Sequence, residues 1–494
     1  MTQGRGGPAP IRFGTDGWRA VMADEFTFAN VERVAQAYAE YVNLHHPQSA
    51  ASAISDVDAS AARSTPLVVV GFDRRFLSEE FARRAAEVLA GNHIGVAAFE
   101  GDVPTPLVSW AVRELGAAGG VIITASHNPP HFNGFKIKAP WGGSATPETT
   151  LAVEALVDAS PTLRAEPQTS AATSAATSQR LASSVESYRS QVASYVDLER
   201  IRAARERVVV DSMHGTGARW VESFLGGGAL EVETIRAERD ALFGGVAPEP
   251  VDRNLGALKS RVLSSGALVG VATDGDADRL GAVGDDGATL TMHDVVPLIL
   301  LHMARRRAMS GGVVRTFSQS VLLKRIAAAH GLKLYETPIG FKYVADLMLG
   351  EEILIGAEES GGIGVSGHIP ERDGILNSLL FLETVVAAGR KPTELVREMH
   401  REFGEFYFGR RDLHIEVARG QELVAALAGQ PPARIAGHAV ASVETLDGTK
   451  LIFGDESWLL FRQSGTEPVL RIYSEATSTA KMESLLEQGC QMAS

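Results

Sequence analysis

The sequence predicts an α/β protein of four domains arranged around one cleft, and three observations support this fold class. The chain has 494 residues, which is too long for one hydrophobic core and corresponds to roughly three or four domains. Short apolar strands alternate with helical segments along the first unit, which is typical of a largely parallel sheet. In four successive units, a short strand runs into a loop of small, polar and charged residues, and such loops favour a shared cleft.

The composition narrows the classes of function. Hydrophobic residues make up 45% and charged residues 22% of the chain, which is ordinary for a soluble globular protein. The net charge of −13 disfavours binding to nucleic acid or to an anionic membrane. Cys490 is the only cysteine, which excludes an internal disulfide framework and indicates a reducing compartment. Since there is also no apolar run of about 18 residues, we expect a cytoplasmic protein, monomeric or homodimeric, without membrane or nucleic-acid partners.

The first unit opens with Phe-Gly-Thr-Asp-Gly-Trp-Arg at residues 13–19. Its two glycines imply a tight loop, which ends at Arg19. Apolar periodicity and capping residues predict the elements that follow. These are a helix over residues 28–44, a strand at residues 67–70, and a helix over residues 79–90 that Ser78 caps and Gly91 closes.

Two segments of low complexity interrupt the first half of the chain. Residues 49–64 and 161–184 are rich in alanine and serine, and we expect a mobile surface insertion and a flexible connector. The expected division of the chain is residues 1–165, a connector at 166–184, and residues 185–293, 294–404 and 405–494.

The stretch Gly-Val-Ile-Ile-Thr-Ala-Ser-His-Asn-Pro-Pro at residues 120–130 contains the first candidate site. Its apolar run predicts a buried strand, and the two prolines bar a helix and stiffen the turn. Ser126 therefore presents a hydroxyl on a rigid loop at a strand end, where it could carry a covalent group. An ordinary polar turn explains Ser126 and His127 as well, because both are common turn residues.

Two cations are expected near this serine, namely Lys136, which follows it closely, and Arg19. A transferring phosphoryl group carries spread negative charge, so its transfer needs positioning, a metal and cationic clamps. The alternative for Lys136 is a solvated surface lysine.

The second unit, residues 185–293, has expected strands at residues 208–210 and 267–272. The later strand runs into Asp274, Asp276 and Asp278, which alternate and therefore share one face of an extended loop. Three carboxylates at one face repel each other unless a cation lies among them.

Oxygen ligands without a nearby histidine or cysteine select Mg²⁺ over zinc. The alternatives are an Asx-rich turn or half of a calcium loop, although the closing glutamate of an EF-hand is absent. Arg279 follows directly and could bind phosphate or neutralise the acidic cluster.

The third unit, residues 294–404, has expected helices at residues 295–303 and 375–386. Between them, a strand at residues 353–355 runs into Gly-Ala-Glu-Glu-Ser-Gly-Gly. Glu358 offers a hydrogen-bond acceptor, and Ser360 offers a hydroxyl that can donate or accept. The glycines around them allow a ligand to approach the backbone closely, so the loop suits neighbouring hydroxyls of a sugar. A glycine-rich turn with solvated acids is the alternative.

The fourth unit, residues 405–494, alternates as strands do and includes apolar strands at residues 458–461 and 469–473. The loop between these strands reads Arg-Gln-Ser-Gly-Thr. A guanidinium fork, two hydroxyls and a glycine that exposes backbone N–H groups form a phosphate cradle. The residues concerned are Arg462, Ser464, Gly465 and Thr466. A polar hairpin loop is the alternative.

Taken together, these loops and their order resemble the α-D-phosphohexomutase superfamily, which includes the phosphoglucomutases and phosphomannomutases. The match runs nearly end to end, from residues 13–19 to residues 462–468. It implies a four-domain α/β architecture in a heart-shaped arrangement. Three similar domains with mixed sheets would be followed by a smaller C-terminal α+β domain, all around one central cleft.

The resemblance also implies roles for individual residues. Ser126 would be the phosphorylated serine and a further ligand of the Mg²⁺ that Asp274, Asp276 and Asp278 bind. Proton transfer and phosphoryl binding would fall to Lys136 and Arg19. His127 stands next to the serine in the sequence and could either orient it or hydrogen-bond within the turn. The sugar contacts would be Glu358 and Ser360. The remaining substrate contacts would be Arg462, Ser464, Gly465 and Thr466, which grip the non-reacting phosphate, with Lys342, Arg372 and Arg279.

The activity implied is a phosphoglucomutase that interconverts glucose 1-phosphate and glucose 6-phosphate, with glucose 1,6-bisphosphate as intermediate and activator. The alternatives are a phosphomannomutase or dual-specificity mutase, or a glucose-1,6-bisphosphate synthase that releases the bisphosphate. A non-enzymatic binding module is disfavoured, because it would need neither the nucleophile nor the metal ligands.

Three departures from the family pattern bear on this interpretation. Gly362 stands where many relatives have histidine, so no histidine can act as general acid there. Arg372 replaces a lysine of some relatives, and arginine stays protonated, so it can bind phosphate but cannot act as a base. Ala277 replaces a common glycine in the metal loop. The Glu-Glu-Ser form of the sugar loop looks more like glucose-directed members than mannose-preferring ones.

Overall fold

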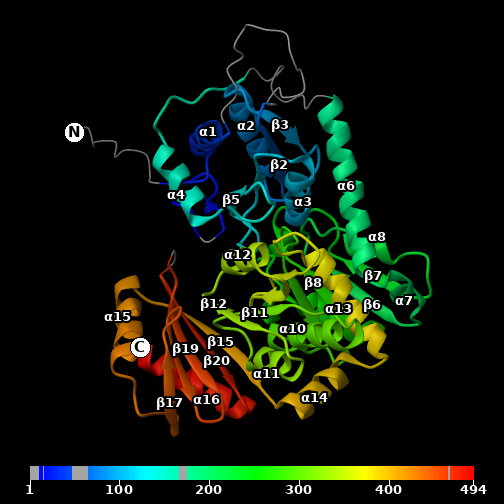
Figure 1. The fold of residues 1–494 in the computed structure, drawn as a ribbon, viewed down its shortest axis with the longest axis vertical. Helices are drawn as coiled ribbons and strands as arrows, with labels where there is room; N and C mark the ends of the chain where they lie inside the picture. The colour runs from blue at the N-terminus through cyan, green and yellow to red at the C-terminus, as the bar shows by residue number, and fades with distance from the viewer. Residues whose placement is uncertain (1–10, 15, 47–64, 166–174, 466–467, 494) are drawn as a thin grey trace.

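The computed structural model describes residues 11–14, 16–46, 65–165, 175–465 and 468–493. Figure 1 shows the first unit in blue at the top, the second and third in green and yellow below it, and the fourth in orange and red at the lower left. Four separate sheets form the framework. No helix among the described residues is both long and apolar enough to span a membrane. The expected mobile insertion at residues 49–64 lies outside the described residues.

The first unit contains β1 (Trp18–Val21), α1 (Phe28–His45), β2 (Leu67–Phe72), α2 (Ser78–Gly91), β3 (Gly95–Ala98), α3 (Thr105–Leu115), β4 (Gly119–Ile123), β5 (Phe132–Lys138) and α4 (Pro147–Leu156). Its sheet has the order β1-β5-β4-β2-β3. Strands β2, β3 and β4 run parallel, whereas β5 pairs antiparallel with β4 and β1. The sheet is therefore mixed, as expected from the resemblance.

The second unit contains α6 (Ala175–Tyr195), α7 (Leu198–Ala203), β6 (Arg207–Asp211), α8 (Trp220–Leu225), β7 (Glu231–Ile235), η1 (Phe243–Gly245), η2 (Asp252–Asn254), α9 (Gly256–Ser265), β8 (Val269–Thr273), β9 (Leu280–Val283) and β10 (Thr289–Leu290). Its sheet has the order β10-β9-β8-β6-β7. Three parallel strands again lie beside two antiparallel ones, so this sheet has the same arrangement as that of the first unit.

The third unit contains α10 (Met292–Leu301), η3 (His302–Arg306), β11 (Gly312–Thr316), α11 (Val321–Ala329), β12 (Leu334–Thr337), α12 (Phe341–Gly350), β13 (Ile353–Ala357), β14 (Ile363–Val365), α13 (Gly374–Ala388) and α14 (Pro392–Phe403). Its sheet has the order β12-β11-β13-β14, with only β14 antiparallel. Helix α13 is buried nearly all around, which explains its almost continuous apolar sequence.

The fourth unit contains β15 (Tyr407–His414), α15 (Val417–Gly429), β16 (Arg434–Ile435), β17 (His438–Glu444), β18 (Thr449–Phe453), β19 (Trp458–Gln463), β20 (Val469–Ala476) and α16 (Thr479–Ala493). Its six strands pair only antiparallel, in the order β15-β20-β19-β18-β17-β16. The first three units are thus α/β with mixed sheets, and the last is a smaller α+β domain, which confirms the predicted fold class.

The structure corrects the predicted boundaries of α2. Leu77 has a left-handed backbone at the N-cap position, so Ser78 is already helical and caps nothing. Its hydroxyl instead donates to Asp73 Oδ1 at 2.7 Å. Gly91 is the last helical residue, and Asn92 follows it as the C-cap. A Cβ on Gly91 would lie 2.8 Å from backbone atoms of Arg164, so this glycine permits a close chain approach.

The flexible connector predicted over residues 161–184 is wrong for its second part. Helix α6 begins at Ala175 and runs through that part into the second unit (Figure 1). Its buried residues include Leu181, Ser184 and Tyr188 at helical spacing, and Arg180 donates to the carbonyl of Leu115 at the end of α3. Alanine favours helix, and packing against α3 supplies the burial that the low-complexity composition conceals.

A buried polar cluster joins the third and fourth units. Glu475 on β20 accepts hydrogen bonds from His293 Nδ1 at 2.8 Å, from the Val321 N–H at 2.9 Å, and from the indole of Trp458 at 3.0 Å. The Ser320 hydroxyl is a fourth donor at 2.5 Å. Burial alone would raise the pKa of Glu475, but His293 and the other donors lower this pKa to about 2.

We expect Glu475→Gln to lower the free energy of unfolding at neutral pH by about 1–3 kcal/mol, because it removes charged hydrogen bonds from a buried site. A lowered folded-state pKa adds stability above the ordinary value of 4.5, and this stability is lost as the pH falls toward about 2. Thermal unfolding of both proteins should therefore show a difference that narrows as the pH drops below about 4.5. A difference independent of pH would contradict this role for the carboxylate.

Candidate functional site

Ser126 lies just beyond the end of β4 in a strained backbone conformation that hydrogen bonds hold. Its φ angle is +50°, in the left-handed region that residues with a side chain rarely adopt. The Ser126 N–H donates to Thr124 Oγ1 at 2.9 Å, and Ser126 Oγ donates to Asp274 Oδ2 at 2.8 Å. The hydroxyl is therefore turned toward the acidic loop of the second unit.

The acidic loop connects β8 to β9, and its own backbone holds the first of its three carboxylates. Asp274 Oδ1 accepts the N–H groups of Asp278 at 3.0 Å and Arg279 at 3.1 Å. Ala277 has φ +58°, which explains why glycine would suit this position. A Cβ on Gly275 would lie 2.4 Å from the Ser126 carbonyl oxygen, so glycine allows the two loops to touch.

The three aspartates fit a magnesium ion. One carboxylate oxygen from each of Asp274, Asp276 and Asp278 lies within 4.8 Å of the others, and all three residues are buried. Asp276 Oδ1 and Asp278 Oδ1 have no hydrogen-bond partner among the described residues. Burial and the two neighbouring carboxylates raise the pKa of Asp274 well above its ordinary value. A hard divalent cation would satisfy both orphaned oxygens and relieve this repulsion.

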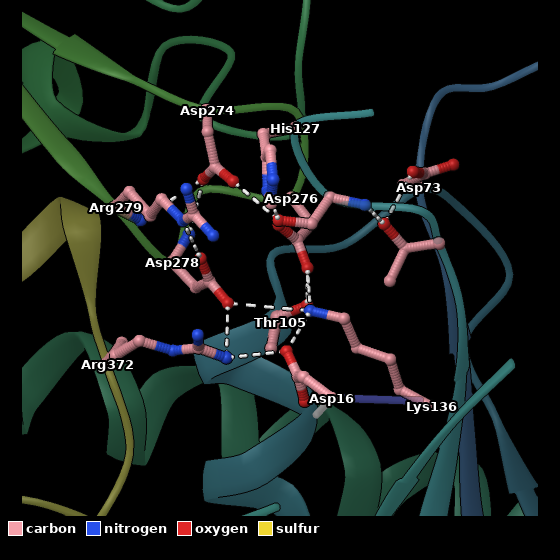
Figure 2. Close-up of polar contacts among 12 residues, drawn as sticks. Asp16, Asp73, Thr105, His127, Lys136, Asp274, Asp276, Asp278, Arg279 and Arg372 are labelled. Carbon is pink, nitrogen blue, oxygen red and sulfur yellow. Dashed lines mark hydrogen bonds and ion pairs between the residues drawn. The ribbon is translucent and has the colours of Figure 1, made fainter. Parts of the chain in front are cut away.

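Two cations from other units cap the same carboxylates (Figure 2). Lys136 Nζ on β5 lies 2.8 Å from Asp276, 3.5 Å from Asp278 and 2.9 Å from Asp16. Arg372 Nη2 lies 2.7 Å from Asp16 and 2.9 Å from Asp278. Burial alone would lower the pKa of Lys136, but these carboxylates raise it above its ordinary value. Lys136 therefore keeps its proton in this arrangement.

Asp16 belongs to the site, although sequence reasoning assigned it no role. It lies in the glycine loop of residues 13–19 and also accepts a hydrogen bond from Ser144 Oγ at 3.0 Å. Burial would raise its pKa, but Lys136 and Arg372 lower this pKa well below the ordinary range. The sequence feature that could have indicated a role for Asp16 is its position as an acid between Gly14 and Gly17. Arg19 Nη2, three residues on, lies 3.8 Å from Asp16 Oδ2, but Lys136 and Arg372 follow more than 100 residues later, so no local pattern pointed to them.

Arg19 and His127 lie beside the serine loop, as expected. Arg19 Nη1 on β1 donates to Asn128 Oδ1 at 2.7 Å. His127 Nδ1 lies 3.3 Å from Ser126 Oγ, so the ring can orient the hydroxyl. Burial and the nearby charges of Arg279 and Arg19 hold the pKa of His127 well below its ordinary value. The imidazole is accordingly neutral near pH 7.

The predicted sugar loop pairs directly with the metal loop. Arg279 forms a backbone bridge with Gly362, and Arg279 Nε lies 3.9 Å from Asp278 Oδ1. Glu358 is buried, and this burial raises its pKa to about 7 against the opposing effect of Arg372. Ser360 is half-buried on the same loop.

The absence of a side chain at Gly362 has a geometric reason. A Cβ there would lie 2.5 Å from Arg372 Cδ and 3.0 Å from Glu358 Oε2. The Arg372 side chain therefore occupies the space that a residue with a side chain would need at position 362. From this space the guanidinium reaches Asp16 of the first unit and Asp278 of the second.

The predicted phosphate loop belongs to the fourth unit and is tied to the third. Arg462 Nε donates to Asp447 Oδ1 at 2.9 Å, while Asp447 Oδ2 accepts the Ile339 N–H of the third unit at 2.8 Å. Gly465 and Lys342 line a cavity of about 260 Å³ together with Asp16. Of the two predicted hydroxyl residues of the loop, Ser464 is buried, and Thr466 lies outside the described residues. The structure thus brings Lys342 and Gly465 to a cavity beside Asp16, which pairs with Lys136 of the metal site.

Comparison with known proteins identifies this arrangement. Models of the phosphoglucomutase/phosphomannomutase family match all four units: the alpha/beta/alpha domains I, II and III at residues 10–164, 186–287 and 293–403, and the C-terminal domain at residues 415–490. A protein of Thermococcus kodakarensis named phosphoglucomutase/phosphomannomutase is 31% identical over 97% of this chain and 98% of its own. This chain belongs to the phosphoglucomutase/phosphomannomutase family.

Further relatives agree with this assignment to the α-D-phosphohexomutase superfamily. A phosphoglucosamine mutase of Halorhodospira halophila is 30% identical over 85% of this chain and 86% of its own. The crystal structure of a putative phosphomannomutase from Thermus thermophilus is 37% identical, has a TM-score of 0.82, and covers 98% of this chain and 99% of its own. The chain is therefore a phosphohexomutase, an isomerase whose sugar these names leave open.

Proposed function

We propose that this phosphohexomutase is a Mg²⁺-dependent phosphoglucomutase that interconverts glucose 1-phosphate and glucose 6-phosphate. The proposal rests on the 2.8 Å hydrogen bond from Ser126 Oγ to Asp274 Oδ2, which places a hydroxyl beside three buried carboxylates. A hydroxyl that can carry a phosphoryl group beside metal ligands suits phosphoryl transfer through a serine ester. In the active enzyme Ser126 would be phosphorylated, and Asp274, Asp276 and Asp278 would hold Mg²⁺ together with an oxygen of this phosphoryl group.

The reaction proceeds in two half-reactions, in which a phosphoryl group passes first from Ser126 to the sugar and then from the sugar back to Ser126. In the first, the bond between phosphorus and Ser126 Oγ breaks, and phosphorus bonds to the free hydroxyl oxygen of the hexose phosphate. The proton lost by that hydroxyl is balanced by the proton gained at Ser126 Oγ. The product, glucose 1,6-bisphosphate, reorients in the cleft and returns its other phosphoryl group to Ser126. Bound Mg²⁺ supplies charge withdrawal at the phosphoryl oxygens.

The cations around the serine stabilise the transferring group. Lys136, Arg19 and Arg279 converge on the serine and metal loops, and such charges offset the negative charge of a transferring phosphoryl group. Lys136 Nζ lies within 3.5 Å of Asp16, Asp276 and Asp278, and we assign it to this electrostatic role. His127 orients Ser126 Oγ, and Arg372 steadies the carboxylates and contacts substrate.

The substrate is held at its far end by the third and fourth units. Glu358 and Ser360 bind sugar hydroxyls. The distal phosphate is held by Arg462, Ser464, Gly465, Thr466 and Lys342. Two opposite orientations of the bisphosphate must both be accepted, so the same loops serve either end of the sugar. Glucose is favoured because the sugar loop has the Glu-Glu-Ser form of glucose-directed family members.

Phosphorus NMR with Mg²⁺ and each sugar 1-phosphate tests the assignment. Glucose 1-phosphate should be converted faster than mannose 1-phosphate or glucosamine 1-phosphate, the last included because several relatives are named phosphoglucosamine mutases. Equal rates on glucose and mannose would indicate a dual-specificity mutase. Net accumulation of bisphosphate from a separate donor would instead identify a bisphosphate synthase.

Two substitutions should separate the sugar loop from the phosphate loop. A charged hydrogen bond in a buried site is worth roughly 1.5–3 kcal/mol, or about ten- to a hundred-fold. Arg462→Ala should raise KM by about that factor for every hexose phosphate, because all carry the phosphate. It should also let the bisphosphate escape into solution. Glu358→Ala should instead change the ratio of rates on glucose and mannose substrates.

The matched control is Arg434→Ala, which removes an exposed arginine of the same domain. Steady-state kinetics with both sugars should leave this control unchanged. If Arg462→Ala altered the sugar preference and Glu358→Ala did not, the two loops would have been assigned the wrong way round.

A further inference from the structure

A fully buried arginine lies behind the nucleophile and holds its loop. Arg75 Nη2 donates to the carbonyl oxygens of Ser126 at 2.6 Å and Asn128 at 2.7 Å. Arg75 Nη1 donates to the carbonyl oxygens of Pro129 at 2.8 Å and Phe132 at 3.1 Å. One guanidinium thus binds four carbonyl groups of the segment that carries the serine. Such planar, multiple donation cannot be reproduced by an ammonium group.

The counter-ion of this arginine holds the other side of the serine. Asp73 Oδ2 lies 3.1 Å from Arg75 Nε and accepts a hydrogen bond from Thr124 Oγ1 at 2.6 Å. Thr124 Oγ1 in turn accepts the Ser126 N–H at 2.9 Å. Arg75 and Asp73 therefore fix both the carbonyl and the N–H of Ser126. This double attachment sustains the left-handed backbone, which would otherwise relax.

The same arginine contacts the second unit, which carries the metal loop. Its guanidinium lies 5.0 Å from the ring centroid of Phe243, a buried residue of η1. Arg239 Nη2 donates to the Arg75 carbonyl oxygen at 3.3 Å. Asp73, Thr124 and Arg75, which together hold the serine loop, therefore lie between this loop and the unit that supplies the aspartates.

We propose that Arg75 is a positioning residue that fixes the direction of Ser126 Oγ for phosphoryl transfer. This inference rests on the proposed function, because it assumes that Ser126 carries the phosphoryl group. The same oxygen must be donor in one half-reaction and acceptor in the other, so its position has to stay constant while the sugar reorients. A displacement of about 1 Å at a reacting group can lower a rate about a hundred-fold. Arg75 acts through backbone carbonyls and does not itself bind the phosphoryl group.

The test compares Arg75→Lys with the neighbouring Arg74→Lys. Arg75→Lys keeps the charge but loses the planar fork, and we expect kcat to fall about a hundred-fold while KM for glucose 1-phosphate changes less than about three-fold. Arg74 pairs with Asp102 and the Ala237 carbonyl, so its replacement disturbs the same contact between units without touching the serine loop. Arg74→Lys should retain kcat within about two-fold.

Loss of the buried Arg75 guanidinium can impair folding, so Thr124→Val provides a second variant that tests the same role. It nearly preserves side-chain volume but removes the hydroxyl that links Ser126 N–H to Asp73, and kcat should fall about ten-fold. Circular dichroism and the melting temperature show which variants are folded. Single-turnover quench-flow kinetics should show slow phosphoryl transfer from the phosphorylated variants, whereas calorimetry should show unchanged Mg²⁺ and sugar phosphate binding.

Two failures are distinguishable. Wild-type transfer rates in folded, phosphorylated Arg75→Lys would overturn the positioning role, and so would a loss of Mg²⁺ binding that parallels the loss of kcat. An enzyme that turns over without phosphate on Ser126 would instead overturn the proposed function.

Discussion

Replacement of Ser126 by alanine should lower mutase turnover by several orders of magnitude while the protein stays folded. The covalent carrier has no substitute in this mechanism, because the phosphoryl group must leave from and return to the same oxygen. The fold should persist because the loop is held through its backbone, by Thr124 and Arg75. Ser126 Oγ itself donates to Asp274 and lies 3.3 Å from His127 Nδ1, so the substitution removes these two side-chain contacts and leaves the backbone contacts in place.

Intact-mass spectrometry and turnover measurements check this expectation together. Purified wild-type protein should contain a species heavier by one phosphoryl group, and the variant should lack it. Ser109→Ala is a matched control, since Ser109 is buried on α3 and its hydroxyl has no hydrogen-bond partner among the described residues. This control should keep both its activity and its phosphorylated species. Near-normal turnover of Ser126→Ala would refute the assignment of the nucleophile.

Removal of the metal should abolish activity, and Asp276→Asn should weaken Mg²⁺ binding by about a hundred-fold or more. Asp276 Oδ2 is already bound by Lys136 at 2.8 Å and Thr105 at 2.6 Å. Its Oδ1 has no partner among the described residues, so this atom is the free ligand position. An amide there carries no charge, and the full charge of Lys136 would then also oppose the cation.

Calorimetric titration with Mg²⁺ and the metal-dependent rise in melting temperature provide readouts that do not depend on activity. Mg²⁺ should restore the chelated enzyme better than Ca²⁺, whose looser coordination positions phosphoryl oxygens less tightly. The control is Asp286→Asn, an exposed carboxylate of the following loop, which should leave the affinity unchanged. Full activity in excess chelator would rule out the metal site.

The loops could be predicted from sequence because each is a short continuous signal. An apolar strand that ends in Thr-Ala-Ser-His-Asn, or in three alternating aspartates, can be recognised without knowledge of any partner. The same holds for the strands and for most helices, such as α1 and α13, which begin and end close to the predicted residues. The first part of helix α6, up to residue 184, was missed because the contacts with α3 that stabilise it cannot be read from its own low-complexity sequence.

The connections between the loops could not be predicted in the same way. Arg74 and Arg75 are equivalent in the sequence after β2, yet only Arg75 turns inward to bind the serine loop. Arg372 was expected to contact phosphate, and the structure adds that it bridges Asp16 and Asp278 from the space left by Gly362. Which carboxylate pairs with which cation depends on distances between separate units.

By itself, the sequence therefore determined which chemical groups this protein carries and on which loops, since strand ends and turn residues are encoded locally. Only the tertiary structure decided how these groups act on one another. Lys136 and Asp276 are 140 residues apart in the chain, and Arg372 and Asp16 are 356 residues apart. Charges meet at such separations only when sheets from different units pack together, and their burial there changes the pKa values of the carboxylates and of the lysine.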